Sequence, residues 1–499
     1  MLSSDIATAF AQAFVVGLAV IWLASRLLGG GSASEAEGAI PEAAGGVPLL
    51  GHALLYKADA PAFLHEQSAR LGPIFRINLA GKRMVVVGAD RAAIAQVTSA
   101  PEAVLSSRSA VQAIGFTEAL GDYNVLCGTD FHKKVLKDWL SAGGLAAEVG
   151  PLHAEFDAAL SLELSRALGG KREGEVRDLL SLVRRVVLRT MISRMLGFSA
   201  GEALLDEVMA FQDHLEDAIA KSSVLPRVLA LPLALWPVQR RRARLCASIV
   251  TEFRRGRAAL SGPWTEAFEA EAMPSAERAE LVVGLLFAAH KNPAIGAAQA
   301  YLHGLERSGP ELVAMRAEAR QFAGAPTAAT LAQCGALRRC ALETCRVTAH
   351  SLGAVRTVLA PAGFTLRTSS GHTYRLRAGE TLALAHASSN TDIATWGTDA
   401  LVYDPRRAEW IDATAGGGAE AFASKGEVDE FKFTTFSQGI HKCPAEKLSL
   451  VVLQCVTACL LSEQAYRLEP VLPVPPVDFE RATLAQRVAP VRMTVRACS

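Results

Sequence analysis

Near its carboxyl end the chain reads Phe436-Ser437-Gln438-Gly439-Ile440-His441-Lys442-Cys443. A cysteine that ligates a metal must act as a thiolate and must be shielded from water and oxidants. Phe436 can supply an apolar lid, and Gly439 lets the backbone turn closely against a flat ligand. His441 and Lys442 can reach negative charge at the edge of that ligand. The stretch predicts that Cys443 is a metal ligand, and a buried structural cysteine is the alternative interpretation.

Two charged motifs precede this cysteine. Leu342-Glu343-Thr344-Cys345-Arg346 contains Glu-x-x-Arg in a helical pattern, and the i, i+3 spacing puts both charges on one face. Tyr403-Asp404-Pro405-Arg406-Arg407 follows, and Glu343 lies 100 residues before Cys443. Surface helices carry many such pairs, so Glu-x-x-Arg alone decides nothing. Burying these charges is costly unless each is paired, so together they indicate a structural network.

In this order and at this spacing, the three motifs resemble those of the cytochrome P-450 superfamily. The resemblance implies a haem-thiolate protein that holds haem b, with Cys443 as the iron ligand. It also implies that Phe436, Gly439 and His441 lie against the haem.

The same resemblance assigns the upstream charges to the haem-binding core. Glu343 and Arg346 would form a buried charge network with an arginine that matches Arg407, or Arg406 in its place. Shorter matches are most similar to the group of sterol 14α-demethylases, with cholesterol 7α-hydroxylase and prostacyclin synthase as further relatives. They are Leu120-Gly121-Asp122-Tyr123-Asn124-Val125, Leu231-Pro232-Leu233, Leu285-Leu286-Phe287-Ala288 and His441-Lys442-Cys443-Pro444-Ala445-Glu446-Lys447.

The segment 128–137 occupies the place where family members pair with a haem propionate. The family's usual Trp-x-x-x-Arg is missing, with Phe131 and Val135 at those positions. The resemblance therefore leaves the propionate role to nearby polar residues, which are His132, Lys133, Lys134 and Lys137. A solvated run of charge is the competing interpretation.

The distal helix departs most from the family pattern. Where members carry an acid and an alcohol that relay protons to dioxygen, this chain reads Ala288-Ala289-His290-Lys291-Asn292-Pro293. Pro293 lacks an N–H, so the carbonyl of Ala289 leaves the helix ladder and the helix should break there. Asn292 shares a face with Ala288 and Ala289 and can hydrogen-bond a ligand. His290 and Lys291 relay protons if they face the cavity, and a plain kink in a packed helix is the alternative.

Composition excludes some classes of function. The 51 Lys and Arg against 50 Asp and Glu leave a net charge of +1, which gives no basic field for nucleic acid. Nine cysteines form no Cys-x-x-Cys pair and suit a reducing compartment. Cys455 and Cys459 have helical spacing without a partner cluster, which favours packing over metal binding.

The amino-terminal region predicts a membrane anchor. Positions 6–25 are uncharged, and such a helix spans roughly 30 Å, the thickness of a bilayer core. Arg26 follows the apolar run and favours a cytosolic catalytic side. We therefore expect an anchor at 1–28, a flexible, Pro-containing linker at 29–50 and one large catalytic domain at 51–499. The layout resembles single-pass members of the family in the endoplasmic reticulum membrane.

Helical patterns dominate the rest of the chain, at 150–220, 240–260, 276–308 and 331–348. The alternation in 72–87 around Ala80-Gly81 predicts a β-hairpin, and strand-like runs occur at 354–385 and 485–496. The fold class expected is mainly α with a minor β-sheet, as in the cytochrome P-450 fold.

Residues 222–238 form a second apolar stretch, interrupted by Pro226, Pro232 and Pro237 and followed by arginines. The prolines exclude a straight membrane helix, so we expect a loop that dips into one leaflet. An ordinary buried loop beside a solvated basic helix is the alternative.

Three functions follow from the resemblance. The first is a monooxygenase that inserts one oxygen atom of O2 into an apolar lipid such as a sterol, with NADPH-cytochrome P-450 reductase as its partner. Lys432, Lys442 and Lys447 would receive the acidic reductase surface. The second is a haem-thiolate isomerase or peroxygenase acting on a lipid peroxide, favoured by the missing acid and alcohol. The third is a non-catalytic haem protein.

Overall fold

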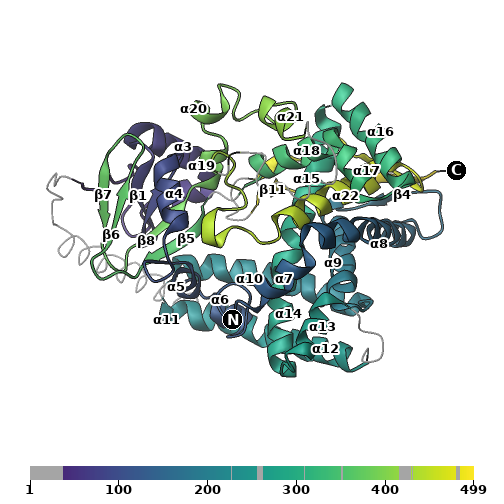
Figure 1. The fold of residues 1–499 in the computed structure, drawn as a ribbon, viewed down its shortest axis with the longest axis horizontal. Helices are drawn as coiled ribbons and strands as arrows, with labels where there is room; N and C mark the ends of the chain where they lie inside the picture. The colour runs from purple at the N-terminus through teal and green to yellow at the C-terminus, as the bar shows by residue number, and fades with distance from the viewer. Residues whose placement is uncertain are drawn as a thin grey trace, which may run out of the picture.

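Long helices account for most of the protein, with small sheets beside them (Figure 1). The computed structural model describes residues 38–225, 227–255, 262–307, 309–349, 352–414, 429, 431–478 and 484–498. Helix makes up 59% and strand 12% of a single body. The predicted class, mainly α with a minor β-sheet, is confirmed. The predicted anchor at 1–28 lies outside the described residues, as does the linker up to residue 37.

The helical pattern at 150–220 is divided among three helices by capping residues. Ser141 accepts a hydrogen bond from the N–H of Gly144 at the start of the first, and Gly169 ends it at φ 56°. Asp178 caps the second in the same way, and Gly197 ends it at φ 76°. Glycine adopts this left-handed conformation without a steric cost, so the chain can turn sharply there.

The longer helices, of eight or more residues, are α3 Ala60–Leu71, α4 Arg91–Ser99, α7 Phe131–Trp139, α8 Ala142–Leu168, α9 Leu179–Leu196, α10 Glu202–Val224, α12 Trp236–Arg255, α13 Pro263–Ala270, α14 Ser275–Ala289, α15 Lys291–Arg307, α16 Pro310–Gly324, α18 Gly335–Val347 and α22 Glu446–Ser462. The shorter ones are α2 Ala53–Ala58, α5 Ser107–Ala113, α6 Phe116–Leu120, α11 Arg227–Ala230, η1 Leu231–Leu235, α17 Ala328–Gln333, α19 His386–Asn390, α20 Ile393–Trp396, α21 Ala408–Thr414 and η3 Gly439–His441.

The main sheet has five strands in the order β1-β2-β8-β5-β3. Its first two strands form the predicted hairpin, with Ile74 opposite Val87 and the turn at Ala80-Gly81. β2 runs parallel to β8, and β5 runs antiparallel to both β8 and β3. The strands are β1 Ile74–Leu79, β2 Lys82–Val87, β3 Leu105–Ser106, β4 Glu173–Val176, β5 Gly353–Val358, β6 Phe364–Arg367, β7 Thr373–Leu376, β8 Thr381–Leu384, β9 Tyr466–Pro470, β10 Val477–Asp478, β11 Gln486–Arg487 and β12 Met493–Ala497.

Two regions of the body meet around the carboxyl-terminal part of the chain. In Figure 1 the main sheet lies together with α3 and α4 at the left of the body, and most of the long helices lie at the right. The largest core cluster includes buried side chains of α8, α9, α15 and α22, among them Cys455 and Cys459. A second core lies under the sheet, around Val85 and Leu382. Cys455 and Cys459 are therefore packing residues, in agreement with their spacing in the sequence.

Most described residues of 222–238 are helical, which corrects the predicted loop. Leu225 is extended after α10, but α11, η1 and α12 follow one another without a break, since Ala230 and Trp236 both have helical φ and ψ. Pro232 lies in the π-helical turn η1 and Pro237 directly after it, and such a widened turn accommodates residues that lack an N–H. Val228, Leu233 and Trp236 are exposed large hydrophobics on this segment. The helix therefore continues through Pro232 and Pro237.

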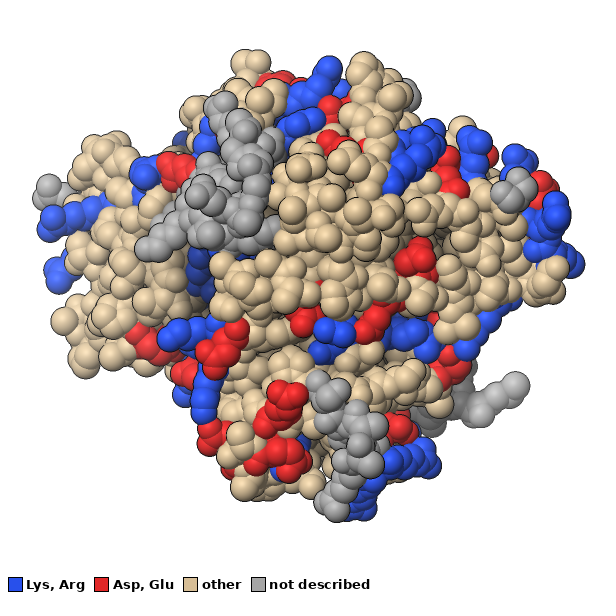
Figure 2. Space-filling view, turned by 45° about the vertical axis from the view of Figure 1, so that its right-hand side comes forward, with Lys and Arg blue, Asp and Glu red and all other residues tan. Residues whose placement is uncertain are grey.

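One helical stretch among the described residues, Ser275–Arg307, is long and apolar enough to cross a bilayer. Within its most apolar window 78% is buried inside the protein, as is usual for a core helix. On the face shown in Figure 2, Lys and Arg alternate with Asp and Glu around a broad area of other residues.

Candidate functional site

The predicted metal-ligand loop leads into α22 and is closed by backbone contacts. The N–H of Cys443 donates to the carbonyl of Phe436 at 2.8 Å. Gly439 has φ 63°, and a Cβ added there would collide with the backbone oxygen of Thr98 in α4. The sequence pattern predicts a glycine that lies against a flat ligand, whereas its contact with α4 and its backbone angle already require glycine here.

The thiol of Cys443 sits in a poorly solvated place. Burial raises its pKa to about 11, and the N–H of Ala445 opposes that rise in part. Phe436 is half-buried and packs edge-on against Phe433, with ring centroids 6.0 Å apart. A cation bound at the sulfur would favour the thiolate instead.

Glu343 is the centre of a buried charge network. Its carboxylate accepts two hydrogen bonds from Arg346, each at 2.7 Å, and one from the indole N–H of Trp410 at 2.8 Å. The Nε of Arg407 lies 3.3 Å from the same carboxylate. Arg406 is exposed and lies 3.7 Å from Asp404, so Arg407 is the arginine that joins the network.

The network reaches the cysteine loop through Asn390. Arg346 donates to the carbonyl of Asn390 at 2.8 Å, and the Asn390 amide donates to the hydroxyl of Thr435 at 2.7 Å. The Asn390 side-chain oxygen also accepts from the N–H of Thr434 at 2.8 Å. Sequence reasoning missed Asn390, because nothing in Ser388-Ser389-Asn390 distinguishes it from an ordinary turn residue.

The residues predicted to meet propionates are scattered along α7. Lys134 pairs with Glu271, Lys133 lies 3.0 Å from Asp130, and Lys137 is exposed. Burial lowers the pKa of His132, so this ring is neutral at pH 7. Of the set, Lys133 is close enough to the cysteine loop to lower the pKa of His441.

Arg356 of β5 is a functional candidate that sequence reasoning missed. Its side chain is 2% exposed, and its Nε and Nη2 find no hydrogen-bond partner among the described residues. Burial lowers its pKa to about 10, and its charge helps to lower the pKa of His441. Nη1 donates to the carbonyl of Val355 at 3.0 Å, but two buried guanidinium nitrogens without partners are costly and point to an anionic ligand. A lone arginine in the apolar run Val355-Arg356-Thr357-Val358 was the available signal.

His441 lies between this arginine and an acid. Its Nε2 is 2.9 Å from the carboxylate of Glu102. Burial tends to raise the pKa of Glu102, but hydrogen bonds from the N–H groups of Arg108 and Ser107 and the hydroxyl of Ser106 lower it overall. The carboxylate is therefore held at the start of α5 next to the loop.

The distal helix breaks where Pro293 predicts, since α14 ends at Ala289 and α15 begins at Lys291. Ala288 is exposed, and Ala289 and Asn292 are partly exposed. His290 is buried, with its Nδ1 3.1 Å from the carbonyl of Leu286. Lys291 is paired with carboxylates of α10, so neither ionisable side chain lies open beside Ala288 and Asn292.

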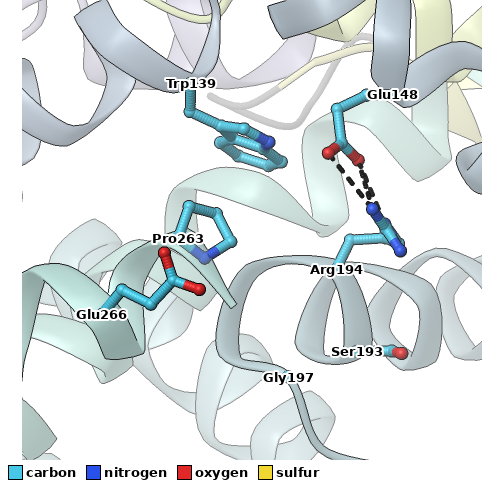
Figure 3. Close-up of a pocket in the computed structure, with 7 residues that line it drawn as sticks. All are labelled: Trp139, Glu148, Ser193, Arg194, Gly197, Pro263 and Glu266. Atoms are coloured by element: carbon cyan, nitrogen blue, oxygen red, sulfur yellow. Dashed lines mark hydrogen bonds and ion pairs between the residues drawn. The ribbon is translucent and has the colours of Figure 1, made fainter. Parts of the chain in front are cut away.

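A separate hollow of about 290 Å³ lies where α7, α8, α9 and α13 meet (Figure 3). The Arg194 guanidinium in it is bound by Glu148 at 2.9 Å and by Glu155 at 3.3 Å. Trp139, Pro263 and Glu266 line the other side. None of the sequence-predicted site residues lines this hollow, and its cation is already satisfied.

Comparison of the chain with models of known protein families gave no match, and a search of curated proteins found no similar sequence. Among the described residues, no group of three or more His, Cys, Asp or Glu side chains is arranged to hold a metal ion.

Replacing Glu343 with Gln should destabilise the protein strongly. The buried Arg346 would lose its counter-charge and Arg407 would keep only the exposed Asp399, which costs about 3–5 kcal/mol. Glu173→Gln is the matched control, because Glu173 is exposed in its 3.1 Å pair with Arg496 and should cost less than about 1 kcal/mol. Unfolding in urea measures both, and equal midpoints for the two variants would contradict a structural role for the network.

His290 should make stability depend on pH. Burial lowers its pKa from 6.5 to about 3, so the unfolded chain binds the extra proton between these values. Its contribution to stability is then complete above pH 6.5 and falls as the pH drops toward 3, by about 1.4 kcal/mol for each pH unit. Melting temperatures between about pH 7.5 and about pH 5 should fall less for His290→Asn than for the wild type. The exposed His372→Asn should behave as the wild type, and a wild-type slope in His290→Asn would refute the assignment.

Proposed function

We propose that this chain is a haem-thiolate oxidoreductase of the cytochrome P-450 class. The observation that carries the proposal is the loop of Cys443, which is tied through Asn390 to the buried Glu343 network. A half-buried cysteine held by so many buried polar contacts suits a ligand whose position must be fixed.

Haem b fits the chemistry of the residues around this loop. Cys443 would hold the iron, and the phenyl ring of Phe436 would shield the sulfur. Arg356, His441 and Lys133 would pair with the propionates, and the unpartnered Nε and Nη2 of Arg356 support this assignment most directly. When bound, haem supplies the activation of dioxygen for transfer of one oxygen atom.

An apolar lipid such as a sterol is the proposed substrate, taken from the membrane. Val228 and Leu233 are 76% and 64% exposed, and Trp236 stands beside them. Arg240, Arg241 and Arg244 are exposed on the following turns of α12. Apolar side chains next to arginines suit an interface with lipid headgroups, which supports membrane contact at 222–238 in addition to the anchor. The proposed location is the cytosolic face of the endoplasmic reticulum membrane.

NADPH-cytochrome P-450 reductase is the proposed electron donor. Lys442 lies 2.8 Å from Glu446, and Lys432 lies 2.5 Å from Glu409. These lysines would have to exchange an internal carboxylate for one on the reductase, which weakens steering by this surface.

A second candidate is a haem-thiolate isomerase or peroxygenase that acts on a lipid peroxide without reductase. The observation that favours it is the engagement of Lys291 by carboxylates of α10, away from Asn292. Such a reaction begins from a preformed peroxide and needs no proton delivery to dioxygen. A non-catalytic haem protein is the third candidate.

Cys443→Ser should abolish the thiolate-type absorbance of the reduced carbon monoxide complex, because a hydroxyl does not replace the thiolate. Oxidation of sterols or fatty acids with NADPH, reductase and oxygen should be lost with it. Cys498→Ser, at an exposed cysteine, should retain both signals. Turnover of a lipid hydroperoxide without NADPH would select the second candidate, and a wild type that binds no haem would refute the proposal.

Arg356→Leu should weaken haem binding by about tenfold or more, since a charge-assisted hydrogen bond is lost. The haem-free variant should nevertheless unfold at higher urea than the haem-free wild type, because two buried guanidinium nitrogens without partners cost about 1–3 kcal/mol. Haem titration and urea unfolding of the two forms measure both effects. Arg375→Leu, on an exposed position of β7, should change neither. A haem-free variant less stable than the wild type would contradict the assignment.

A further inference from the structure

We propose that Asp213 and Glu216 of α10 act through Lys291 as positioning residues for the break between α14 and α15. The ammonium of Lys291 lies 2.8 Å from Asp213 and 2.6 Å from Glu216. Its side chain is 4% exposed, whereas that of Asp213 is 51% exposed. We call this contact the interhelical latch.

The latch belongs to a balanced group of four charges. Arg184 of α9 is almost buried and lies 3.0 Å from the other oxygen of Asp213. Burial tends to raise the pKa of Asp213, but the hydrogen bond from Arg184 and the charge of Lys291 lower it overall. Two cations and two carboxylates therefore face each other, and both buried cations are compensated by carboxylates of α10.

The same face of α10 also contacts the last turn of α14. The side-chain amide of Gln212 donates to the carbonyl of Phe287 at 3.3 Å, three residues before the break. Spacing of i, i+1 and i+4 brings Gln212, Asp213 and Glu216 to one side of the helix. Both the end of α14 and the first side chain of α15 are thus held by α10.

Movement of α10 away from the break would leave the Lys291 ammonium buried without a counter-charge, which is strongly unfavourable. α10 ends at Val224, and it packs against α11 and η1, the segment with the exposed apolar side chains. The latch therefore couples that surface segment to the face carrying Ala288 and Asn292. Its effect on a lipid ligand rests on the proposed function, but the coupling itself does not.

Hydrogen exchange of the full-length protein tests the coupling directly. Lys291→Met should raise exchange about tenfold or more at amides of 209–218 and 286–294, with no change in α8. Asp213 keeps Arg184 and Glu216 reaches solvent, so this variant should still fold. Lys291→Arg should restore slow exchange. Lys221→Met is the matched control, since Lys221 is an exposed cation of α10 paired with Asp217 at 2.6 Å on the same helix.

Unchanged exchange in Lys291→Met, or an equal rise in α8, would overturn the latch. The haem absorbance of the loaded protein reports the release of a bound fatty acid or sterol. Release should be faster in Lys291→Met than in the wild type, and unchanged in Lys291→Arg and Lys221→Met. Equal release rates with altered exchange would reject the link to the ligand. If the protein binds no haem, the proposed function is wrong. The exchange experiment still tests whether the interhelical latch exists, because it needs no haem.

Discussion

The structure depends on one buried carboxylate, that of Glu343. Two arginines and an indole N–H converge on it with almost no solvent access, so removing it would leave Arg346 buried without a counter-charge and Arg407 with only the exposed Asp399. Arg346 binds backbone carbonyls of Asn390 and Ala400, and Arg407 binds those around Asp399. The carboxylate thereby joins α18 to a long irregular segment that carries little secondary structure of its own. Because Asn390 continues these contacts to Thr434 and Thr435, the position of the cysteine loop is a consequence of this ion-pair geometry.

Much of the fold could be predicted because it follows from local patterns of apolar, glycine and proline residues. The hairpin at 72–87 follows from alternation around a Gly turn, and the helix break follows from Pro293. The Glu343 set could be predicted because its members belong to motifs of recognisable spacing. Arg356 and Asn390 could not, because their importance comes from tertiary neighbours far away in the chain. The loop predicted at 222–238 is wrong for most of its described residues, because the helix widens into η1 around Pro232 and Pro237 and does not end there.

The two sides of the break between α14 and α15 carry different kinds of side chain. Toward α10, every ionisable side chain at the break is engaged, with His290 held against its own helix and Lys291 in the latch. Toward the open side stand Ala288, Ala289 and Asn292, which are small or uncharged. These three side chains cost an apolar ligand little desolvation, and none of them titrates near neutral pH.

That asymmetry bears on which chemistry the protein performs. Lys291 stands where the resembled family carries an acid, and its partners in the structure are themselves acids on the covering helix. The charge of Lys291 is compensated by these acids, so it serves the contact between helices and is not available to the open face. Proton transfer there would have to pass through water held by Asn292 or by backbone carbonyls freed at the break. A reaction that starts from a peroxide avoids this demand, whereas a reductase-driven oxygenation must meet it. The choice between the two proposed activities is therefore a question about water beside Asn292, and the proximal cysteine loop has no part in it.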